Sequence, residues 1–343
     1  MLHVGLIGFG GIAQAHRAAY EKLAKEGAPV KLLAACDIDP EQFKRRIEIN
    51  LGASDVDPAS KMACYTDLEE MLAREPLDLI DICLPTPLHA PYAIDMLGRG
   101  YHVLSEKPMA RTSGLCQAMV DAAAKSRGQL MIGQCLRFFP QYEYLRDLVQ
   151  QETYGKAISA VFERTSGPPR WAWENWFMDY ERSGGCLLDM HIHDLDMARA
   201  LFGEPEAVSC VTRDVQSRMD VVHSTLFYGD GKPVFALGDW SMEGCPFQHG
   251  YRIGFEQATV IFDGSKVTVY PRGGDSFAAD LPYEQGGIER EIRYFTGLLE
   301  SGRPNEINPP QSALRSVLLA EALRDSALAG GTRVTLKDQE VRG

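Results

Sequence analysis

The chain begins with the stretch M-L-H-V-G-L-I-G-F-G-G-I-A, residues 1–13. A short apolar run at 4–7 turns directly into Gly8-x-Gly10-x-x-Ala13, and residues with helical spacing follow. In such a strand–turn–helix, Gly8 allows the tight turn, Gly10 lets phosphates approach the backbone, and Ala13 lets the helix pack closely on the strand. Free N–H groups and the positive end of the helix dipole then face an anion. The stretch therefore predicts a diphosphate-binding turn. Its residues are Gly8, Phe9, Gly10, Gly11, Ile12 and Ala13.

A second apolar run, residues 30–36, follows one helix length later and ends at Asp37. Together the two runs complete a βαβ-sized unit with a carboxylate at the tip of its second strand, where it can accept hydrogen bonds from an adenosine ribose. A carboxylate repels a 2′-phosphate, and no arginine follows directly at 38–40. The unit therefore predicts NAD rather than NADP as cofactor. The alternative is an ordinary strand–turn–helix in which Asp37 is a solvated loop residue.

The composition is typical of a globular protein with two domains. The chain has 343 residues, 45% hydrophobic and 24% charged, with a formal net charge of −12. This charge argues against a nucleic acid or an anionic membrane as partner. No apolar run approaches the ~18 residues of a membrane helix, and the N-terminus shows no export-signal pattern. Eight scattered cysteines without a C-x-x-C pair indicate free thiols in a reducing cytoplasm and no structural zinc.

The chain divides into two styles of sequence, at about residue 135. In the first, strand-like and helical runs alternate, which predicts a doubly wound parallel sheet covered on both faces. The strands are expected at 3–7, 31–36, 78–84, 101–105 and 129–134, and the helices at 12–25, 40–50, 66–74, 89–99 and 113–126. We expect domains at 1–135 and 136–343.

The second style has many strand-like runs joined by turn signals such as Gly229-Asp230-Gly231. It predicts an α+β domain with a large open antiparallel or mixed sheet. The runs lie at 157–165, 207–212, 224–227, 234–242, 252–255, 259–262 and 266–270, with helices at 186–202, 285–300 and 309–328.

Two loops follow predicted strands of the first half, at 83–89 and at Ser105-Glu106-Lys107-Pro108. Both lie at the carboxyl ends of parallel strands, where doubly wound sheets bind ligands. Lys107 is therefore expected at the nicotinamide, and a cis bond before Pro108 would fix its direction. The alternative for a single lysine after a strand is a surface charge. The expected cofactor contacts from these loops are Leu84, Pro85, Thr86, His89, Glu106 and Lys107.

A third motif runs from Gly184-Gly185 to Asp196. In one continuous helix, Asp189 and His193 share a face and Asp196 lies on or near it, so an aspartate can orient the imidazole of a general base. The alternative is a structural hydrogen-bonded pair. The sequence H-x-H also raises the question of a metal, but residues two apart on a helix diverge. We therefore expect no metal held by His191 and His193.

Together these motifs resemble the Gfo/Idh/MocA oxidoreductases, over nearly the whole chain and in the family's order. The resemblance implies a Rossmann domain followed by a domain with an open, mostly antiparallel sheet that commonly forms the subunit interface of a homodimer or homotetramer. It also implies NAD-dependent transfer of a hydride to or from a hydroxyl carbon of a sugar, sugar acid or inositol. By position, Lys107 is the active-site lysine, Asp189 a substrate-site acid and His193 the acid/base. One departure is His191, where the family often has glycine.

The chemistry assigns further roles. A histidine with its ordinary pKa of about 6.5 exchanges protons near neutrality, and a lysine cation stabilises a developing alkoxide. Substrate contacts are expected from Arg137, Asp189, His193, Trp176 and Tyr283. Arg137 could equally anchor the domain junction. The cluster of Trp171, Trp173 and Trp176 could equally be a packed core or a subunit contact. Two alternative functions remain: an NAD-dependent glycoside hydrolase and a non-catalytic sugar sensor.

Overall fold

The computed structural model describes residues 1–45 and 62–336. The described chain forms two compact units. The first contains Met1–Cys135, Ala172–Glu174 and Gly286–Leu314, and the second contains Leu136–Trp171, Asn175–Gln285 and the residues from Arg315 onward. The break after Cys135 lies where the sequence style changes, but the structure groups the late segment 286–314 with the first unit. No helix in the described part of the chain is both long and apolar enough to cross a membrane.

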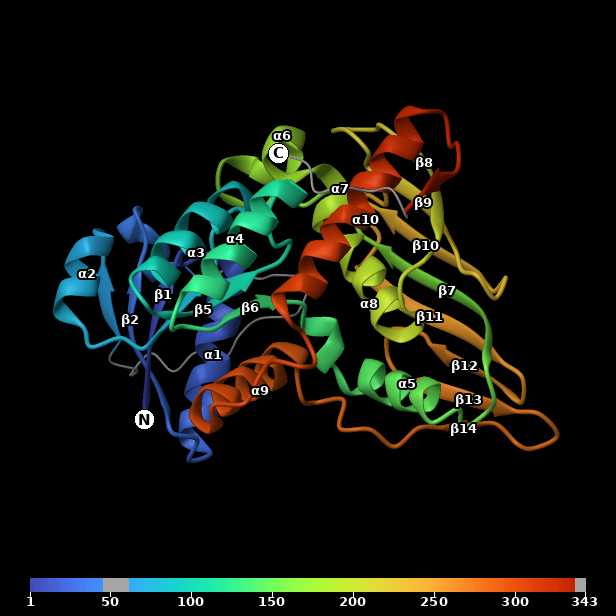
Figure 1. Cartoon of the computed structure of the whole chain (residues 1–343), viewed down its shortest axis with the longest axis horizontal. Coiled ribbons are helices and arrows are strands. Elements are labelled where there is room, and N and C mark those ends of the chain that lie inside the picture. The colour runs from blue at the N-terminus through green and yellow to red at the C-terminus, as the bar shows by residue number, and fades with distance from the viewer. Residues whose placement is uncertain (46–61, 337–343) are drawn as a thin grey trace. The chain divides into compact units, whose positions relative to one another are not determined.

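The first unit is built on a six-stranded parallel sheet (Figure 1). Its strand order is β3-β2-β1-β4-β5-β6, which is the order of a dinucleotide-binding Rossmann fold. The strands are β1 (Leu2–Ile7), β2 (Val30–Cys36), β3 (Ala63–Tyr65), β4 (Leu79–Ile82), β5 (His102–Glu106) and β6 (Leu130–Gly133). The order reverses between β1 and β4, so a crevice for ligands is expected at the carboxyl ends of these two strands.

Helices cover both faces of this sheet, with α1 beside α9 and α3 beside α4 (Figure 1). They are α1 (Gly11–Lys25), α2 (Leu68–Arg74), α3 (His89–Gly98), α4 (Ser113–Lys125) and α9 (Gly287–Ser301), with short 3-10 helices η1 (Pro40–Lys44) and η2 (Thr86–Leu88). Side chains cap two of these helices: Asp67 accepts a hydrogen bond from the Glu70 amide, and Thr112 from the Leu115 amide. Apolar residues of α1, α9 and the strands form one core, which includes Tyr20, Leu79 and Phe295.

The second unit is built on a nine-stranded sheet of order β14-β13-β12-β11-β7-β10-β9-β8-β15. Neighbouring strands are antiparallel except β7 and β10, which pair in parallel. The strands are β7 (Ala157–Thr165), β8 (Ala207–Arg213), β9 (Val221–Phe227), β10 (Pro233–Asp239), β11 (Gln248–Phe255), β12 (Ala258–Phe262), β13 (Val267–Pro271), β14 (Phe277–Ala278) and β15 (Val334–Thr335).

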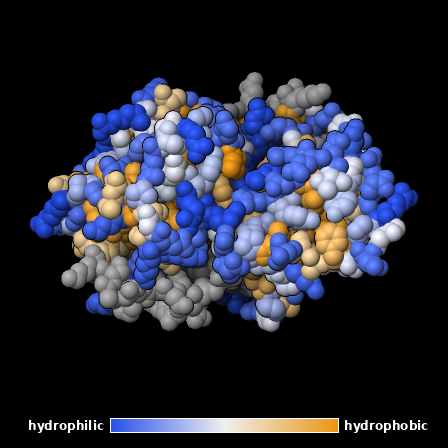
Figure 2. Space-filling view, turned by 90° about the horizontal axis from the view of Figure 1, so that it is seen from below, coloured by the Kyte–Doolittle hydropathy of each residue, from blue (hydrophilic) through white to orange (hydrophobic). Residues whose placement is uncertain are grey.

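Helices pack on one face of this sheet (Figure 1). They include α5 (Pro140–Gln150), α6 (Tyr180–Ser183), α7 (Gly185–Asp189) and α8 (Ile192–Phe202), while α10 (Pro310–Leu328) begins in the first unit and continues in the second. The other face exposes apolar side chains, because Val211, Phe235 and Tyr270 are 58%, 47% and 47% exposed. On the face of the molecule drawn in Figure 2, apolar residues form separate groups among polar ones.

The structure confirms the two expected sheets and most expected elements, and the main differences are these. The expected helix 186–202 is two helices, α7 and α8, separated at Met190 and His191. Of the expected helix 40–50, only the 3-10 turn η1 is described, and residues 46–50 lie outside the described part. The short strand β3 and the helix α5 were not expected.

Candidate active site

The turn between β1 and α1 has the geometry expected of a phosphate-binding turn. Gly8 has a φ of +86°, and a Cβ there would lie 2.7 Å from the carbonyl oxygen of Cys83. At Gly10, by contrast, an added Cβ would meet no atom within 4 Å. Ala13 is fully buried where α1 packs against the strands. The turn therefore leaves open space at the residue where a diphosphate would approach the backbone.

The N-terminus of α1 is suited to an anion. Its N-cap residue, Gly10, provides no side-chain hydrogen bond, and no acidic residue lies in the first turn. The helix dipole is thus left without a negative side chain at its positive end. Asp37, directly after β2, accepts hydrogen bonds from the Phe9 amide at 2.7 Å and the Asp39 amide at 2.9 Å. Each carboxylate oxygen keeps a second lone pair for a ribose hydroxyl.

The loop after β4 approaches the loop after β5 through His89. Its buried ring lies with Nδ1 2.8 Å from the Pro108 carbonyl oxygen and Nε2 2.7 Å from the Leu84 carbonyl oxygen. Burial lowers the pKa of His89, and the two carbonyl groups oppose that shift. Both ring nitrogens therefore face backbone carbonyl groups, and the ring ties the two loops to each other.

The same loops contain two further features of the expected cofactor site. Thr86 is buried, and its hydroxyl has no hydrogen-bond partner among the described residues. Such an unsatisfied polar atom beside the open turn fits a site completed by a ligand. The Lys107–Pro108 bond is cis, as the sequence suggested. The turn, the uncapped helix and Thr86 together fit a dinucleotide.

Glu106, the last residue of β5, is buried, and each of its carboxylate oxygens has a hydrogen-bond partner. Its Oε2 accepts a hydrogen bond from the Lys107 amide at 3.0 Å, and its Oε1 lies 3.0 Å from His16 Nε2. Burial raises the pKa of Glu106, but the His16 ring and Lys107 lower it, so the pKa falls below its ordinary value. A carboxylate with these partners is a structural anion beside Lys107 rather than a proton donor.

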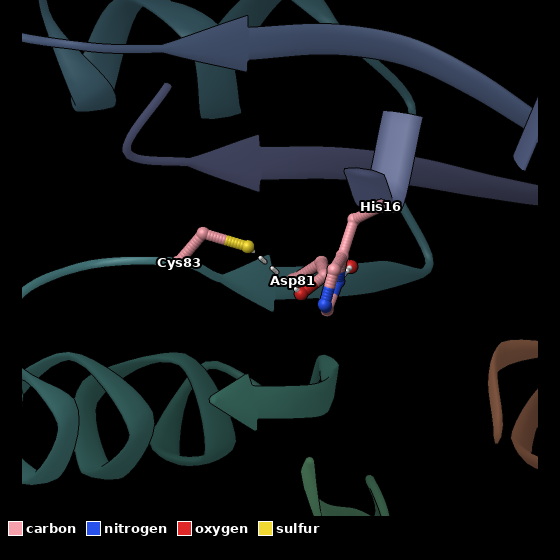
Figure 3. A group of neighbouring side chains, drawn as sticks. All are labelled: His16, Asp81 and Cys83. Atoms are coloured by element: carbon pink, nitrogen blue, oxygen red, sulfur yellow. Dashed lines mark hydrogen bonds and ion pairs between the residues drawn. The ribbon is translucent and has the colours of Figure 1, made fainter. Parts of the chain in front are cut away.

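The second ring nitrogen of His16, Nδ1, faces a cluster of buried polar side chains that the sequence analysis did not predict (Figure 3). His16 Nδ1 lies 2.8 Å from Asp81 Oδ2, and the Tyr20 hydroxyl donates to the same oxygen at 2.9 Å. The Cys83 thiol lies 3.6 Å from Asp81 Oδ1, and burial raises its pKa to about 12. A sequence signal existed, because Ala13, His16, Tyr20 and Leu23 follow helical spacing along one buried stripe of α1.

Three of these side chains, His16, Asp81 and Cys83, lie close enough together to be ligands of one metal ion. Their hydrogen bonds favour protons over a metal. Both nitrogens of His16 already face carboxylates, and the high pKa of Cys83 disfavours the thiolate that a metal would need. We therefore treat the group as a hydrogen-bonded network.

In the second unit, Asp189 and His193 lie on two different helices. Asp189 is the last residue of α7 and is 8% exposed, whereas His193 lies in the first turn of α8. Between them the His191 amide donates to the Cys186 carbonyl, five residues back, which widens the turn. The single continuous helix that was expected to align the two residues is therefore wrong, although both belong to one tightly turned segment. Such wide turns recur at functional sites.

The ring of His191 causes this break by entering the sheet side of the unit. It is fully buried, and its Nε2 lies 2.8 Å from the Ser224 hydroxyl of β9. A Cβ at Gly238 of β10 would lie 3.0 Å from His191 Nδ1, so any larger residue would push the ring from its present position. Burial lowers the pKa of His191 to about 3, which keeps it neutral. His191 is thus a packing residue inside the unit.

Two buried ion pairs anchor α8. Arg137 makes two hydrogen bonds of 2.7 Å to Asp196, and Arg164 makes two to Asp194 at 3.0 and 3.1 Å. The Ser316 hydroxyl of α10 also donates to Asp196. Asp196, three residues after His193 on the same helix α8, therefore pairs with Arg137. Both members of the Arg137–Asp196 pair belong to the second unit, where the pair anchors α8.

The two aromatic candidates are placed differently. The Tyr283 hydroxyl accepts from the Val267 amide at 2.8 Å and donates to the Ala279 carbonyl at 3.3 Å, so it holds its own loop against β13. Trp176 stacks on Phe177 with ring centroids 4.0 Å apart, and the neighbouring Trp171 and Trp173 are 44% and 45% exposed. The tryptophan cluster is thus a surface feature, open to a ligand or a subunit.

Comparison with known proteins agrees with this fold. The profile described as "Oxidoreductase family, NAD-binding Rossmann fold" matches residues 2–134, and the "GFO/IDH/MocA C-terminal domain" matches residues 142–265. The first of these descriptions places the chain in the class of NAD-binding oxidoreductases. The chain belongs to the Gfo/Idh/MocA family, and its cofactor is NAD.

Named relatives cover much of the chain. Myo-inositol 2-dehydrogenase of Thermotoga maritima is 25% identical over 93% of this chain and 89% of its own length. Levoglucosan dehydrogenase of Pseudarthrobacter phenanthrenivorans is 28% identical over 61% of this chain and 53% of its own length. A solved levoglucosan dehydrogenase, in complex with NADH and levoglucosan, shares the fold with a TM-score of 0.83 at 20% identity, covering 98% of this chain and 100% of that chain. These dehydrogenases give no support to the glycoside hydrolase or sensor alternatives.

Proposed function

We propose that this enzyme transfers a hydride between NAD and a hydroxyl-bearing carbon of a sugar, sugar acid or inositol. The observation that carries the proposal is the open space at Gly10 before the uncapped α1, together with Lys107 at the carboxyl end of β5 in the same parallel sheet. Relatives named for myo-inositol and levoglucosan support a cyclic polyol or sugar as the substrate class.

The proposed roles follow from the chemistry of each side chain. When bound, NAD supplies the hydride acceptor or donor. His193 takes the proton of the substrate hydroxyl, and Asp189 holds a neighbouring hydroxyl of the substrate. Lys107, held at its backbone by Glu106, stabilises negative charge on the substrate oxygen. The proposal requires the two units to bring Lys107 to His193.

The substitution Lys107→Ala tests this assignment. We expect turnover to fall by about 100-fold or more, because one preorganised cation is lost from the developing alkoxide. NADH affinity should change by less than about threefold, since the turn and Asp37 stay intact. A panel of inositols, aldoses and sugar acids with NAD⁺, read by NADH absorbance, gives turnover, and NADH fluorescence gives affinity. Lys125→Ala, at an exposed lysine on α4, is the control, and normal turnover by Lys107→Ala would refute the role.

We further propose that copies of this chain associate through the uncovered face of the nine-stranded sheet. Phe235 pairs with Val161 across β10 and β7 and with Thr225 across β9, which aligns an apolar row with exposed Phe235 in it. Exposed apolar side chains on an ordered sheet favour a subunit contact. Phe235→Lys should convert a dimer or tetramer to smaller species in sedimentation, whereas Lys232→Ala at the same hairpin should not. An unchanged assembly would exclude this face.

The cysteines support a reducing, cytoplasmic location. All eight are free thiols, and five of them are buried. Secreted proteins of oxidising compartments generally pair such residues in disulfides.

A further inference from the structure

His16 forms a buried bridge between two carboxylates of adjacent strands. From α1 its ring reaches Asp81 on β4 through Nδ1 at 2.8 Å, and Glu106 on β5 through Nε2 at 3.0 Å. A neutral imidazole has one N–H donor and one acceptor nitrogen, and ionised carboxylates only accept. Both short contacts are satisfied together when His16 carries a proton on each nitrogen. The geometry thus indicates an imidazolium inside the first unit.

The groups around the bridge are consistent with that charge. Tyr20 and Cys83 both turn toward Asp81, where they act as neutral donors. Burial alone lowers the pKa of His16, but the charge of Asp81 and its hydrogen bond raise it well above the ordinary value. Other charges act on the groups next to the bridge. Glu291 raises the pKa of Tyr20, and Lys107 lowers the pKa of Glu106. Glu106 in turn raises the pKa of His89 and of Cys83.

Glu106 connects this bridge to the lysine of the proposed active site. One oxygen faces His16 and the other accepts the Lys107 amide hydrogen at 3.0 Å. On the far side, a Cβ at Gly133 of β6 would lie 3.1 Å from Glu106 Oε1, so glycine gives the carboxylate its space. The carboxylate therefore has one position, set by His16, Gly133 and the Lys107 backbone.

We propose that His16 is a positioning residue: its imidazolium holds the Glu106 carboxylate in place, and that carboxylate fixes the backbone of Lys107. The inference takes the catalytic importance of Lys107 from the proposed function. The bridge itself, however, is a property of the protein without substrate or cofactor, and it can be tested in that state.

The first experiment uses the unaltered protein, labelled with ¹⁵N-histidine and free of cofactor. We expect NMR to show the His16 ring, assigned by its proximity to Tyr20, with both nitrogens protonated at pH 7.5, above the ordinary histidine pKa of about 6.5. The assignment is needed because His89 also has an acceptor at each ring nitrogen, and a neutral His16 ring would contradict the proposal. This measurement needs no variant and therefore stands even where a substituted protein fails to fold.

A matched pair of substitutions then separates the two ends of the bridge. In His16→Asn, the side-chain amide takes the place of Nδ1 and keeps a donor toward Asp81. In His16→Gln, the longer side chain puts the amide at the place of Nε2 and keeps a neutral donor toward Glu106. In His16→Asn we expect Glu106 to become protonated at neutral pH, because the buried carboxylate loses the imidazolium that stabilises its charge. The infrared spectrum of His16→Asn should show a carboxylic-acid band. This band should be absent from the double variant His16→Asn/Glu106→Gln.

Amide hydrogen exchange at Lys107 reports the positioning. We expect it to be about tenfold faster in His16→Asn than in the unaltered protein, and less accelerated in His16→Gln. Tyr20→Phe is the control, because it removes a neutral donor to Asp81 and keeps the bridge. Equal acceleration in Tyr20→Phe would show a general loosening and refute a specific role. Neither readout uses substrate, so failure of the substrate panel would count against the proposed function alone.

Discussion

At the scale of single residues, the two glycines of the β1–α1 turn are constrained by different neighbours. At Gly8, the positive φ and the Cys83 carbonyl leave no room for a side chain. At Gly10 the protein itself places nothing within 4 Å of an added Cβ. The fold therefore requires the first glycine, whereas the second is explained by a ligand that approaches the backbone.

This difference gives opposite expectations for two variants. Gly8→Ala should lower the free energy of unfolding by about 1–3 kcal/mol, because alanine disfavours that φ and meets the Cys83 carbonyl. Gly10→Val should change it by less than about 1 kcal/mol but weaken NADH binding tenfold or more. Urea unfolding and NADH fluorescence measure the two quantities. Unaltered NADH affinity in Gly10→Val would place the diphosphate elsewhere.

The positions of individual residues could be predicted from the sequence where a local backbone motif determines them. The glycine turn, Asp37 and the cis bond before Pro108 all depend on local chain geometry. His16 and Asp81 were missed because their relation spans 65 residues and appears only when α1 packs on β4. The pairing of Arg137 with Asp196 could not be predicted for the same reason, since 59 residues separate the two.

At the scale of elements, the break between α7 and α8 depends on contacts with the sheet. His191 can leave the helix because its ring fills the space above Gly238 and bonds to Ser224. Helical periodicity continues through 186–202, so the sequence alone predicts one helix. Strands β1, β2, β4 and β5 were easier to predict, because continuous apolar runs suit a sheet buried on both faces. The three-residue β3 offers too short a run.

The substitution Gly238→Ala tests the role of that contact. The new Cβ would lie 3.0–3.1 Å from His191 and Cys186, so the α7–α8 break must shift by a few tenths of an ångström. We expect a loss of about 1–3 kcal/mol in unfolding free energy and a lower turnover, since Asp189 and His193 flank the break. Gly297→Ala in α9, where an added Cβ meets nothing within 4 Å, is the control and should be neutral or stabilising by up to about 1 kcal/mol.

At the scale of the whole molecule, the dependence of stability on pH is set by histidines whose pKa values are shifted in opposite directions on folding. Burial lowers the pKa of His191 to about 3 and of His249 to about 4, and it also lowers the pKa of His89 and His102. These groups bind protons in the unfolded chain before they do so in the folded one. Their stabilisation is present above pH ~6.5 and is lost as the pH falls toward the folded values. His16, with its raised pKa, contributes stability below pH ~6.5 that is lost as the pH rises.

The unfolding free energy of the cofactor-free protein should therefore peak near pH ~6.5 and fall on the acid side by about 1.4 kcal/mol per pH unit for each fully neutral buried histidine. His249 is the most informative site, because its Nδ1 has no hydrogen-bond partner among the described residues and its ring packs between Phe247 and Phe262. His249→Gln should reduce the acid slope between pH ~6.5 and ~4.5 by about one proton, as measured by urea unfolding at several pH values. His3→Gln, at a partly exposed histidine, is the matched control for the substitution itself. An unchanged slope in His249→Gln would mean that this ring is already protonated in the folded protein, in which case Arg164 and burial do not keep it neutral.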